Sequence, residues 1–267
     1  TVTLPVTTGD GECFADSTGT LNDCGSAPAP GSCQGIIYAS QYGVVCDGST
    51  DNTAALALVK TALGTGGYRV IMPGGLCNYT SWNLGSLTNV IIQGAAGLTM
   101  NSSNYGTALN CTRVDAGTCL TVTTSAGFGF QNIAIIKAGA HTGVVVDMSS
   151  ATSTWNKNFL YNVEFRRLSG TANNGTLLYL KRTVEVLAQN VRFSHANVGV
   201  AGVLNGESTS DQSSTALFTC NQCDFTVLAL AFINPGLDWT FTNSHFEVTA
   251  TLSPVLITAQ SGNTVKG

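Results

Sequence analysis

The sequence predicts an all-β protein built as a solenoid of parallel strands. Only 10% of its 267 residues are Asp, Glu, Lys or Arg, whereas 30 are glycine and many others are Ser, Thr or Asn. This composition favours strands and turns over helices. The segments FQNIAI, LYNVEF, AQNVRF, NQCDF and TNSHF also recur at intervals of 21 to 32 residues. Such an interval is long enough for one coil of three strands with their turns.

Aligning the five segments puts side chains of one kind in each column. Strand alternation sends the Phe column toward the interior and the residue before it outward. The amides, at the start of each segment, are of the kind that hydrogen-bond from one coil to the next. The amide column is Asn132, Asn162, Asn190, Gln222 and Asn243; the Phe column is Ile135, Phe165, Phe193, Phe225 and Phe246; the outward column is Ala134, Glu164, Arg192, Asp224 and His245.

Residues 42–76 predict a strand, a helix and a second strand in that order. Thr50, Asp51 or Asn52 can cap a helix of about residues 52–63, and GTGG ends it. YRVIM then reads as a strand and PGG as a turn. Because residue 58 is Leu, where a calcium loop starting at Asp47 needs Glu, the segment does not fit an EF-hand. It also lacks the pattern of a phosphate-binding loop.

The same stretch, YGVVCDGSTDNTAAL followed by GGYRVIMPGG, resembles the opening segment of pectate-lyase-like, or pectin-lyase-like, right-handed parallel β-helices. Cys46 stands where that pattern has Gly, and Asn52 where it has a second Asp. The resemblance implies a right-handed parallel β-helix whose short helix covers the open end of the solenoid, and it implies no particular activity. The matching residues are Asp47, Gly48, Asp51, Thr53, Ala54, Gly66, Gly67, Pro73 and Gly75.

The first 35 residues form an extended segment that composition alone predicts to be loop or linker. Within it, GECFADSTGTLNDCG resembles an element of bacteriophage tail fibres and tailspikes, with Cys24 in place of Ser. The matching residues are Gly11, Phe14, Asp16, Thr18, Gly19, Leu21, Asp23 and Gly25.

This second resemblance implies a virion tail protein outside the cell, homotrimeric, that attaches to host cell-surface polysaccharide. Residues 1–35 would dock to other tail or baseplate proteins, and residues 36–267 would form the β-helix. Either the chain continues beyond residue 267 or a partner covers that end. The alternatives are a secreted polysaccharide lyase or glycoside hydrolase on the same fold, and a non-catalytic structural fibre subunit.

Nine cysteines indicate an oxidising environment. Cys111 and Cys119 flank a short loop and are a candidate disulfide. Cys220 and Cys223 face opposite sides if they share one regular strand, which argues against a bond unless the strand bends between them. CNQC lacks the second half of a zinc site, so we expect neither metal nor cofactor. The net charge of -4 argues against nucleic acid, and no stretch is apolar enough to insert in a membrane.

Polysaccharide hydrolysis needs two carboxyl groups at about 5 Å or about 6.5–9.5 Å. Glu164 and Asp224 lie two coils apart in the outward column, and Asp238 and Glu247 lie near the next coil. These four acids are the catalytic candidates, and Arg192 and His245 are the candidates for substrate binding. An alternating stack of acid and base is also what a purely structural ladder would show, and we favour that interpretation of the stack. The motifs of polygalacturonases, alginate epimerases and pectate lyases are absent, so whether the protein is an enzyme stays open.

Overall fold

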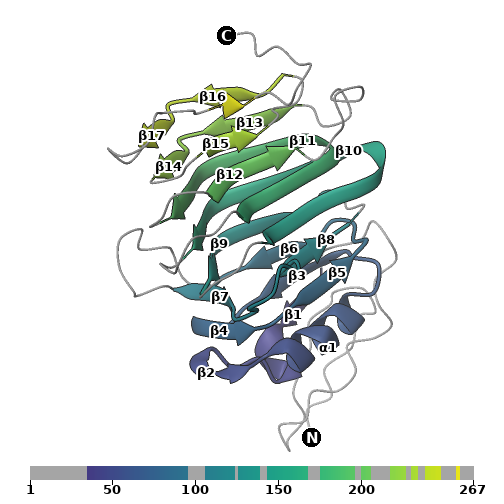
Figure 1. Ribbon diagram of the computed structural model, residues 1–267. Coiled ribbons are helices and arrows are strands. Elements are labelled where there is room, and N and C mark those ends of the chain that lie inside the picture. The colour runs from purple at the N-terminus through teal and green to yellow at the C-terminus, as the bar shows by residue number, and fades with distance from the viewer. Residues whose placement is uncertain are drawn as a thin grey trace, which may run out of the picture.

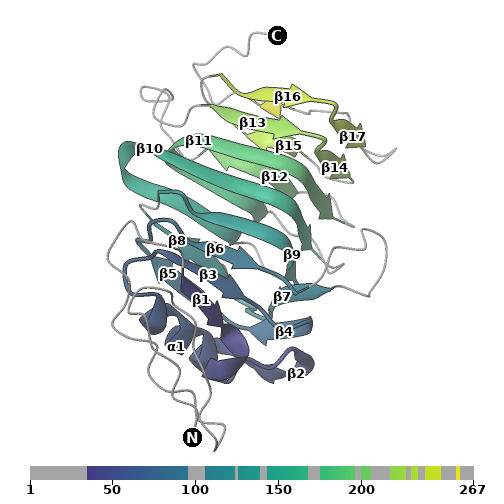
Figure 2. The same cartoon turned by 180° about the vertical axis from the view of Figure 1, so that it is seen from behind.

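The computed structural model is a right-handed parallel β-helix, as the sequence predicts, with strands stacked from one end to the other (Figure 1). Every pairing between the described strands is parallel. The long strands β10 and β11 bend through all three sides of the coil (Figures 1 and 2). The structure describes residues 35–95, 106–123, 126–138, 143–167, 175–195, 200–205, 217–226, 230–233, 238–247 and 257–258.

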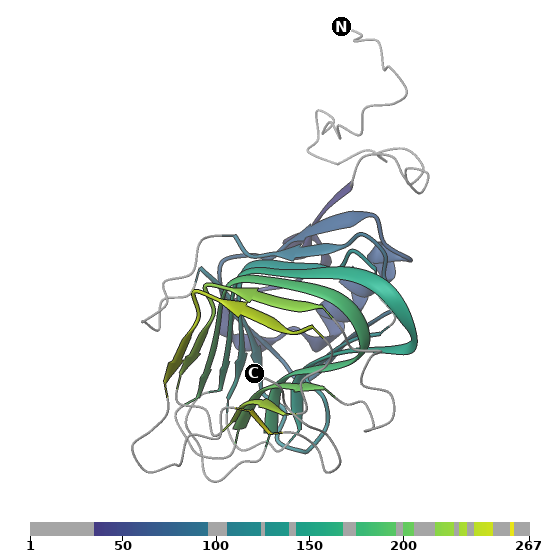
Figure 3. The ribbon, with the colours of Figure 1, turned by 90° about the horizontal axis from the view of Figure 1, so that it is seen from above.

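The strands stack in three ladders, one on each side of the coil (Figure 3). The first ladder contains β1 (Gly35–Tyr38), β3 (Tyr68–Ile71), β6 (Ile91–Gln93), the start of β9 (Gly129–Lys137), the middle of β10 (Val144–Arg167) and β11 (Gly175–His195), β13 (Phe218–Asn221) and β16 (Thr240–Thr242). The second contains β2 (Asp47–Asp51), β4 (Gly75–Tyr79), β7 (Thr107–Cys111), the ends of β9, β10 and β11, β14 (Asp224–Thr226) and β17 (His245–Glu247). The third contains β5 (Trp82–Gly85), β8 (Leu120–Val122), the starts of β10 and β11, β12 (Val200–Asn205), β15 (Leu230–Ile233) and β18 (Ile257–Thr258).

Helix α1 (Thr53–Leu63) lies at the N-terminal end of the stack, beside the short 3-10 helix η1 (Ala39–Tyr42) (Figures 1 and 2). Its bounds agree with the helix expected at about residues 52–63. Leu56, Val59 and Leu63 are fully buried in the main core. The helix therefore closes the apolar interior of the solenoid at that end. No helix in the described part of the chain is long and apolar enough to span a membrane.

Asn52 occupies the N-cap position of α1, but its side chain bridges backbone groups of other segments. Its Oδ1 accepts from the Val45 N–H at 2.7 Å. Its Nδ2 donates to the carbonyls of Val45 at 2.9 Å and Asn78 at 3.1 Å. The β-helix pattern has Asp at this position, but a carboxylate could not donate these hydrogen bonds. Asn therefore suits this buried site. Asp51 instead accepts from the Thr53 N–H at the helix start, at 3.0 Å.

The predicted Phe column forms a continuous stack inside the second ladder. The rings of Phe165 and Phe193 have centroids 5.1 Å apart, those of Phe193 and Phe225 are 4.8 Å apart, and those of Phe225 and Phe246 are 5.0 Å apart. All three pairs are nearly parallel. The parallel register places each ring directly over the ring of the preceding coil. The Phe column is thus the part of the core that repeats from coil to coil.

The predicted amide column is an asparagine ladder at the corner between the first and second ladders. Asn162 Nδ2 donates to Asn132 Oδ1, and Asn190 Nδ2 donates to Asn162 Oδ1, both at 2.9 Å. The expected bonding between coils is therefore confirmed for these three. All five members of the column have left-handed backbones, with φ between 50° and 56°. Asn tolerates this conformation better than other side chains, which explains why the column is amide-rich.

Within the described residues, three disulfides join Cys46 to Cys77, Cys111 to Cys119 and Cys220 to Cys223. The first ties the segment before α1 to the next coil. The chain's other three cysteines, Cys13, Cys24 and Cys33, lie outside the described residues, as does nearly all of the extended segment 1–35.

The expectation that Cys220 and Cys223 stay unbonded is wrong. It assumed one regular strand, in which residues three apart face opposite sides. Gln222 instead has φ of 56°, which breaks the strand into β13 and β14. Both sulfur-bearing side chains therefore turn into the core, where Cys220 and Cys223 are buried.

Candidate functional site

The outward column of the second ladder is a stack of alternating charges, here called the charge column. The register aligns Glu164 with Arg192, Arg192 with Asp224, and Asp224 with His245. Arg192 Nε lies 3.2 Å from Asp224 Oδ2, and His245 Nδ1 lies 3.1 Å from Asp224 Oδ1. The Thr226 hydroxyl also donates to Asp224. Asp224 is therefore held by a base from each neighbouring coil.

Glu164 lies on this outer face but is buried, with 1% of its surface exposed. The Ser194 hydroxyl donates to its Oε1 at 3.4 Å. Burial raises the pKa of the Glu164 carboxyl, although Arg166 and Arg192 act in the opposite direction. Its neighbour in the column, Ala134, is also buried, in a small second cluster with Ala108 and Ile136. Facing outward from the coil thus does not make Glu164 accessible to a polymer.

Replacing Glu164 with Gln should change how stability depends on pH. The folded state holds the Glu164 proton more tightly than the unfolded chain does, because its pKa is raised. Its contribution to stability is therefore present below the ordinary value of 4.5 and is lost as pH rises through the raised pKa. We expect Glu164→Gln to gain stability relative to the native protein as the pH rises above 4.5 and through the raised pKa of Glu164. Urea unfolding of both proteins at each pH measures this, and parallel pH profiles would contradict it.

Three of the four candidate acids, Glu164, Asp224 and Glu247, lie on the second ladder, and the fourth does not. Asp238 lies in an exposed turn ahead of β16, on the first ladder. Glu247 ends β17 and pairs in register with Thr226. The register places Arg192 between Glu164 and Asp224, as the sequence indicates. The column thus has the geometry of an ion-pair ladder, with one acid buried and another neutralised. Among the described residues, no group of three or more His, Cys, Asp or Glu is placed to hold a metal ion.

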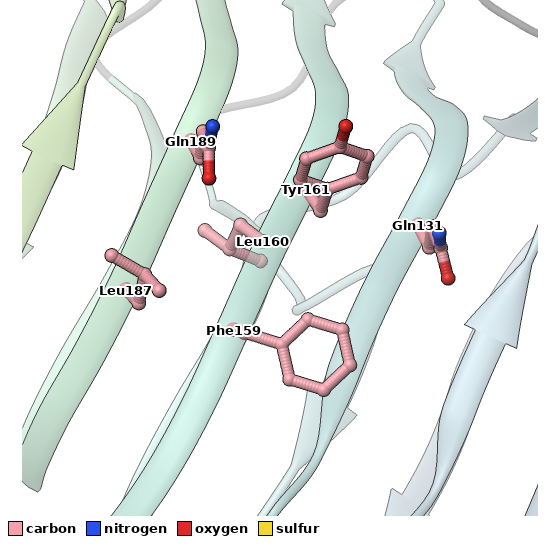
Figure 4. Close-up of a pocket in the computed structure, with 6 residues that line it drawn as sticks. All are labelled: Gln131, Phe159, Leu160, Tyr161, Leu187 and Gln189. Atoms are coloured by element: carbon pink, nitrogen blue, oxygen red, sulfur yellow. The ribbon is translucent and has the colours of Figure 1, made fainter.

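A shallow groove of about 300 Å³ lies on the outer face of the first ladder, across three consecutive coils (Figure 4). Tyr161 sits at its centre, and the register places Gln131 and Gln189 on either side of it. Tyr161 and Leu187 are 45% and 48% exposed, so two large side chains adjoin at this surface. The lining residues are Gln131, Phe159, Leu160, Tyr161, Leu187 and Gln189.

The Phe159 ring lies over Gly129 of the neighbouring strand. A Cβ at Gly129 would come within 2.3 Å of the ring. The absence of a side chain there lets the ring lean across the sheet, as Figure 4 shows, instead of standing away from it. Gly129 therefore helps to shape this side of the groove.

Sequence reasoning missed the groove, although a signal was present. Gln131, Tyr161 and Gln189 each come directly before a member of the asparagine ladder, so they form one column of the repeat. The left-handed residue that follows them turns the chain onto the second ladder. Because the charged side chains lie on the second ladder, past the asparagine ladder, a search for charged residues selects the charge column and not the groove.

Comparison with known proteins finds likeness only among solved structures. No protein-family model and no curated protein matches the chain. A protein described as a glycosyl hydrolase, from Parabacteroides merdae, is 13% identical with a TM-score of 0.41, covering 78% of this chain and 96% of its own. The ORF18 protein of Geobacillus virus E2 is 12% identical with a TM-score of 0.33, covering 79% and 59%. The pectin methylesterase of Aspergillus niger is 12% identical with a TM-score of 0.33, covering 89% and 93%. Likenesses this low carry no argument about activity.

Proposed function

We propose that this protein is a bacteriophage tail protein, a tailspike or tail fibre, that attaches to host cell-surface polysaccharide without cleaving it. The groove around Tyr161 carries the binding half of this proposal. It offers an exposed aromatic ring, an apolar floor and two side-chain amides. Sites of this kind bind ligands by apolar contact and orient them with a few polar groups.

The charge column supports attachment over cleavage. A glycoside hydrolase needs one carboxyl group as acid and another as base or nucleophile, both reaching the same bond. Here Glu164 is buried and Asp224 is paired with Arg192 and His245. Neither carboxyl group is placed as a free catalytic partner of the other.

The virion assignment rests on the tail-fibre-like element of residues 11–25, which lies outside the described residues. It implies that the N-terminal segment docks to the particle and that three chains assemble. Light scattering on the chain should then give a mass near three times 27.6 kDa. A monomer would favour the secreted protein instead.

An adsorption assay combined with a cleavage assay tests the proposed function. Labelled protein should bind bacterial cells that carry surface polysaccharide, and periodate treatment of the cells should abolish the binding. Incubation with the purified polysaccharide should release neither reducing ends nor unsaturated ends. If ends are released and Asp224→Asn stops the release, the protein is a depolymerase and the charge column is its site. Adsorption that survives periodate would contradict glycan attachment.

A further inference from the structure

The outer face of the first ladder carries two parallel columns that run along the solenoid axis. One, here called the glutamine column, presents a hydrogen-bonding side chain on each of six successive coils. The other, here called the apolar column, has no polar side chain at its first four positions and a threonine at each of its last two. The glutamine column is Gln93, Gln131, Tyr161, Gln189, Asn221 and Thr242; the apolar column is Ile91, Gly129, Phe159, Leu187, Thr219 and Thr240.

None of these positions holds Asp, Glu, Lys, Arg or His. At the N-terminal end, Arg69 on β3 lies in register with Ile91 and donates to Gln93 Oε1 at 3.1 Å. The adjoining face of the second ladder, by contrast, carries the charge column. From the groove toward Asn221 and Thr242, a ligand rich in carboxylate or phosphate would find no counter-charge within the two columns, and its desolvation would go uncompensated. The face therefore suits an uncharged ligand with apolar surfaces and many hydroxyl groups, which describes a neutral sugar.

The spacing of the columns indicates a polymer. Neighbouring strands lie about 4.8 Å apart, so the glutamine column repeats its donors and acceptors at that interval. A side-chain amide both donates and accepts hydrogen bonds, so it can pair with a sugar hydroxyl group that acts as acceptor or as donor. A single small molecule would occupy only the groove, whereas a linear chain can continue over Asn221 and Thr242.

We propose that this face binds a linear, neutral polysaccharide lying parallel to the solenoid axis. Its sugar rings pack on Phe159 and Tyr161, and its hydroxyl groups bond to the glutamine column. This inference rests on the proposed function and adds the class of the glycan, its site and its direction.

The test uses the full chain and an array of neutral and uronate-containing bacterial polysaccharides. Tyr161→Ala is compared with Tyr38→Ala, a matched control. Tyr38 is 48% exposed and lies on β1 at the far end of the ladder, away from the groove. It is in register with Ile71, which in turn pairs with Gln93. We expect Tyr161→Ala to weaken binding at least about tenfold and Tyr38→Ala to change it less than about twofold. Gln189→Ala, at a half-buried position, provides a second variant should Tyr161→Ala fold poorly.

Salt and fragment length test the ligand class and its direction. Raising NaCl from about 0.05 to about 0.5 M should change affinity less than about twofold, because a neutral ligand has no charge to screen. An oligosaccharide long enough to span several coils should bind at least about tenfold tighter than a disaccharide of the same glycan. Steep salt dependence, preference for uronates, or equal affinity for both lengths would overturn the inference.

The remaining outcomes separate this inference from the proposed function. Binding to no polysaccharide on the array contradicts both. Binding that is equally strong in the Tyr161→Ala and Gln189→Ala variants leaves glycan attachment standing but removes this face as its site. A change in solution mass on Tyr161→Ala would show that the face contacts another copy of the chain, and would also overturn the inference.

Discussion

Replacing Phe193 with Ala should lower the free energy of unfolding by about 3–5 kcal/mol. The Phe193 ring is fully buried and stacks on Phe165 on one side and Phe225 on the other. Its removal leaves a cavity in the middle of the stack and breaks the contact between two pairs of coils. In a solenoid each coil is stabilised by its neighbours, so the defect affects both sides. Urea unfolding followed by far-ultraviolet circular dichroism measures the change.

Phe246→Ala is the matched control for that prediction. Among the described residues, Phe246 stacks in parallel on Phe225 and meets Phe241 edge-on, and it is partly exposed. We expect its replacement to cost less than half of what Phe193→Ala costs, because less apolar surface returns to water and one stacked pair is lost instead of two. Equal losses for the two variants would show that the stack does not couple the coils.

Replacing Asn162 with Ala should lower the free energy of unfolding by about 2–4 kcal/mol. Asn162 is the middle member of the asparagine ladder, so the change removes both of its side-chain bonds, to Asn132 and Asn190. It also puts Ala at φ of 54°, a left-handed conformation that strains most side chains. The lost bonds and the strained backbone therefore add together.

Asn162→Gly separates these two contributions. Glycine adopts the left-handed conformation without strain but cannot form the ladder bonds. We expect a loss of about 1–2 kcal/mol, clearly smaller than that of the Ala variant. Chemical unfolding of both variants under one set of conditions gives the difference. If the two losses are equal, the left-handed backbone contributes nothing measurable and the ladder acts through its hydrogen bonds alone.

The parts of the fold that follow from local chemistry and from the repeat were predictable. The start and end of α1 follow from the polar residues before it and the glycines after it. The Phe stack and the asparagine ladder follow from alignment, because parallel strands in register place equivalent residues of successive coils directly over one another. Each of these features needs only short-range preference plus one repeated interval.

The candidate site depended on what the strands do beyond that repeat. The burial of Glu164 is a property of the folded outer face, which strand alternation alone does not reveal. The Cys220–Cys223 disulfide required a left-handed residue at Gln222, and alternation ceases to hold through such a residue. Both features lie beyond the same rule, since period-two alternation describes a straight strand and says nothing of its ends or of what covers it.

The sequence by itself determined a β-helix with a helix at one end, an aromatic stack inside and an amide column at a corner, because these recur from coil to coil. Only the tertiary structure decided which outer face carries the groove. Phe159, Tyr161 and Leu187 come from two coils, and Gly129 and Gln131 from a third. Their groove exists because stacking brings the three coils side by side, and strand spacing sets a distance between them that separation along the chain does not encode.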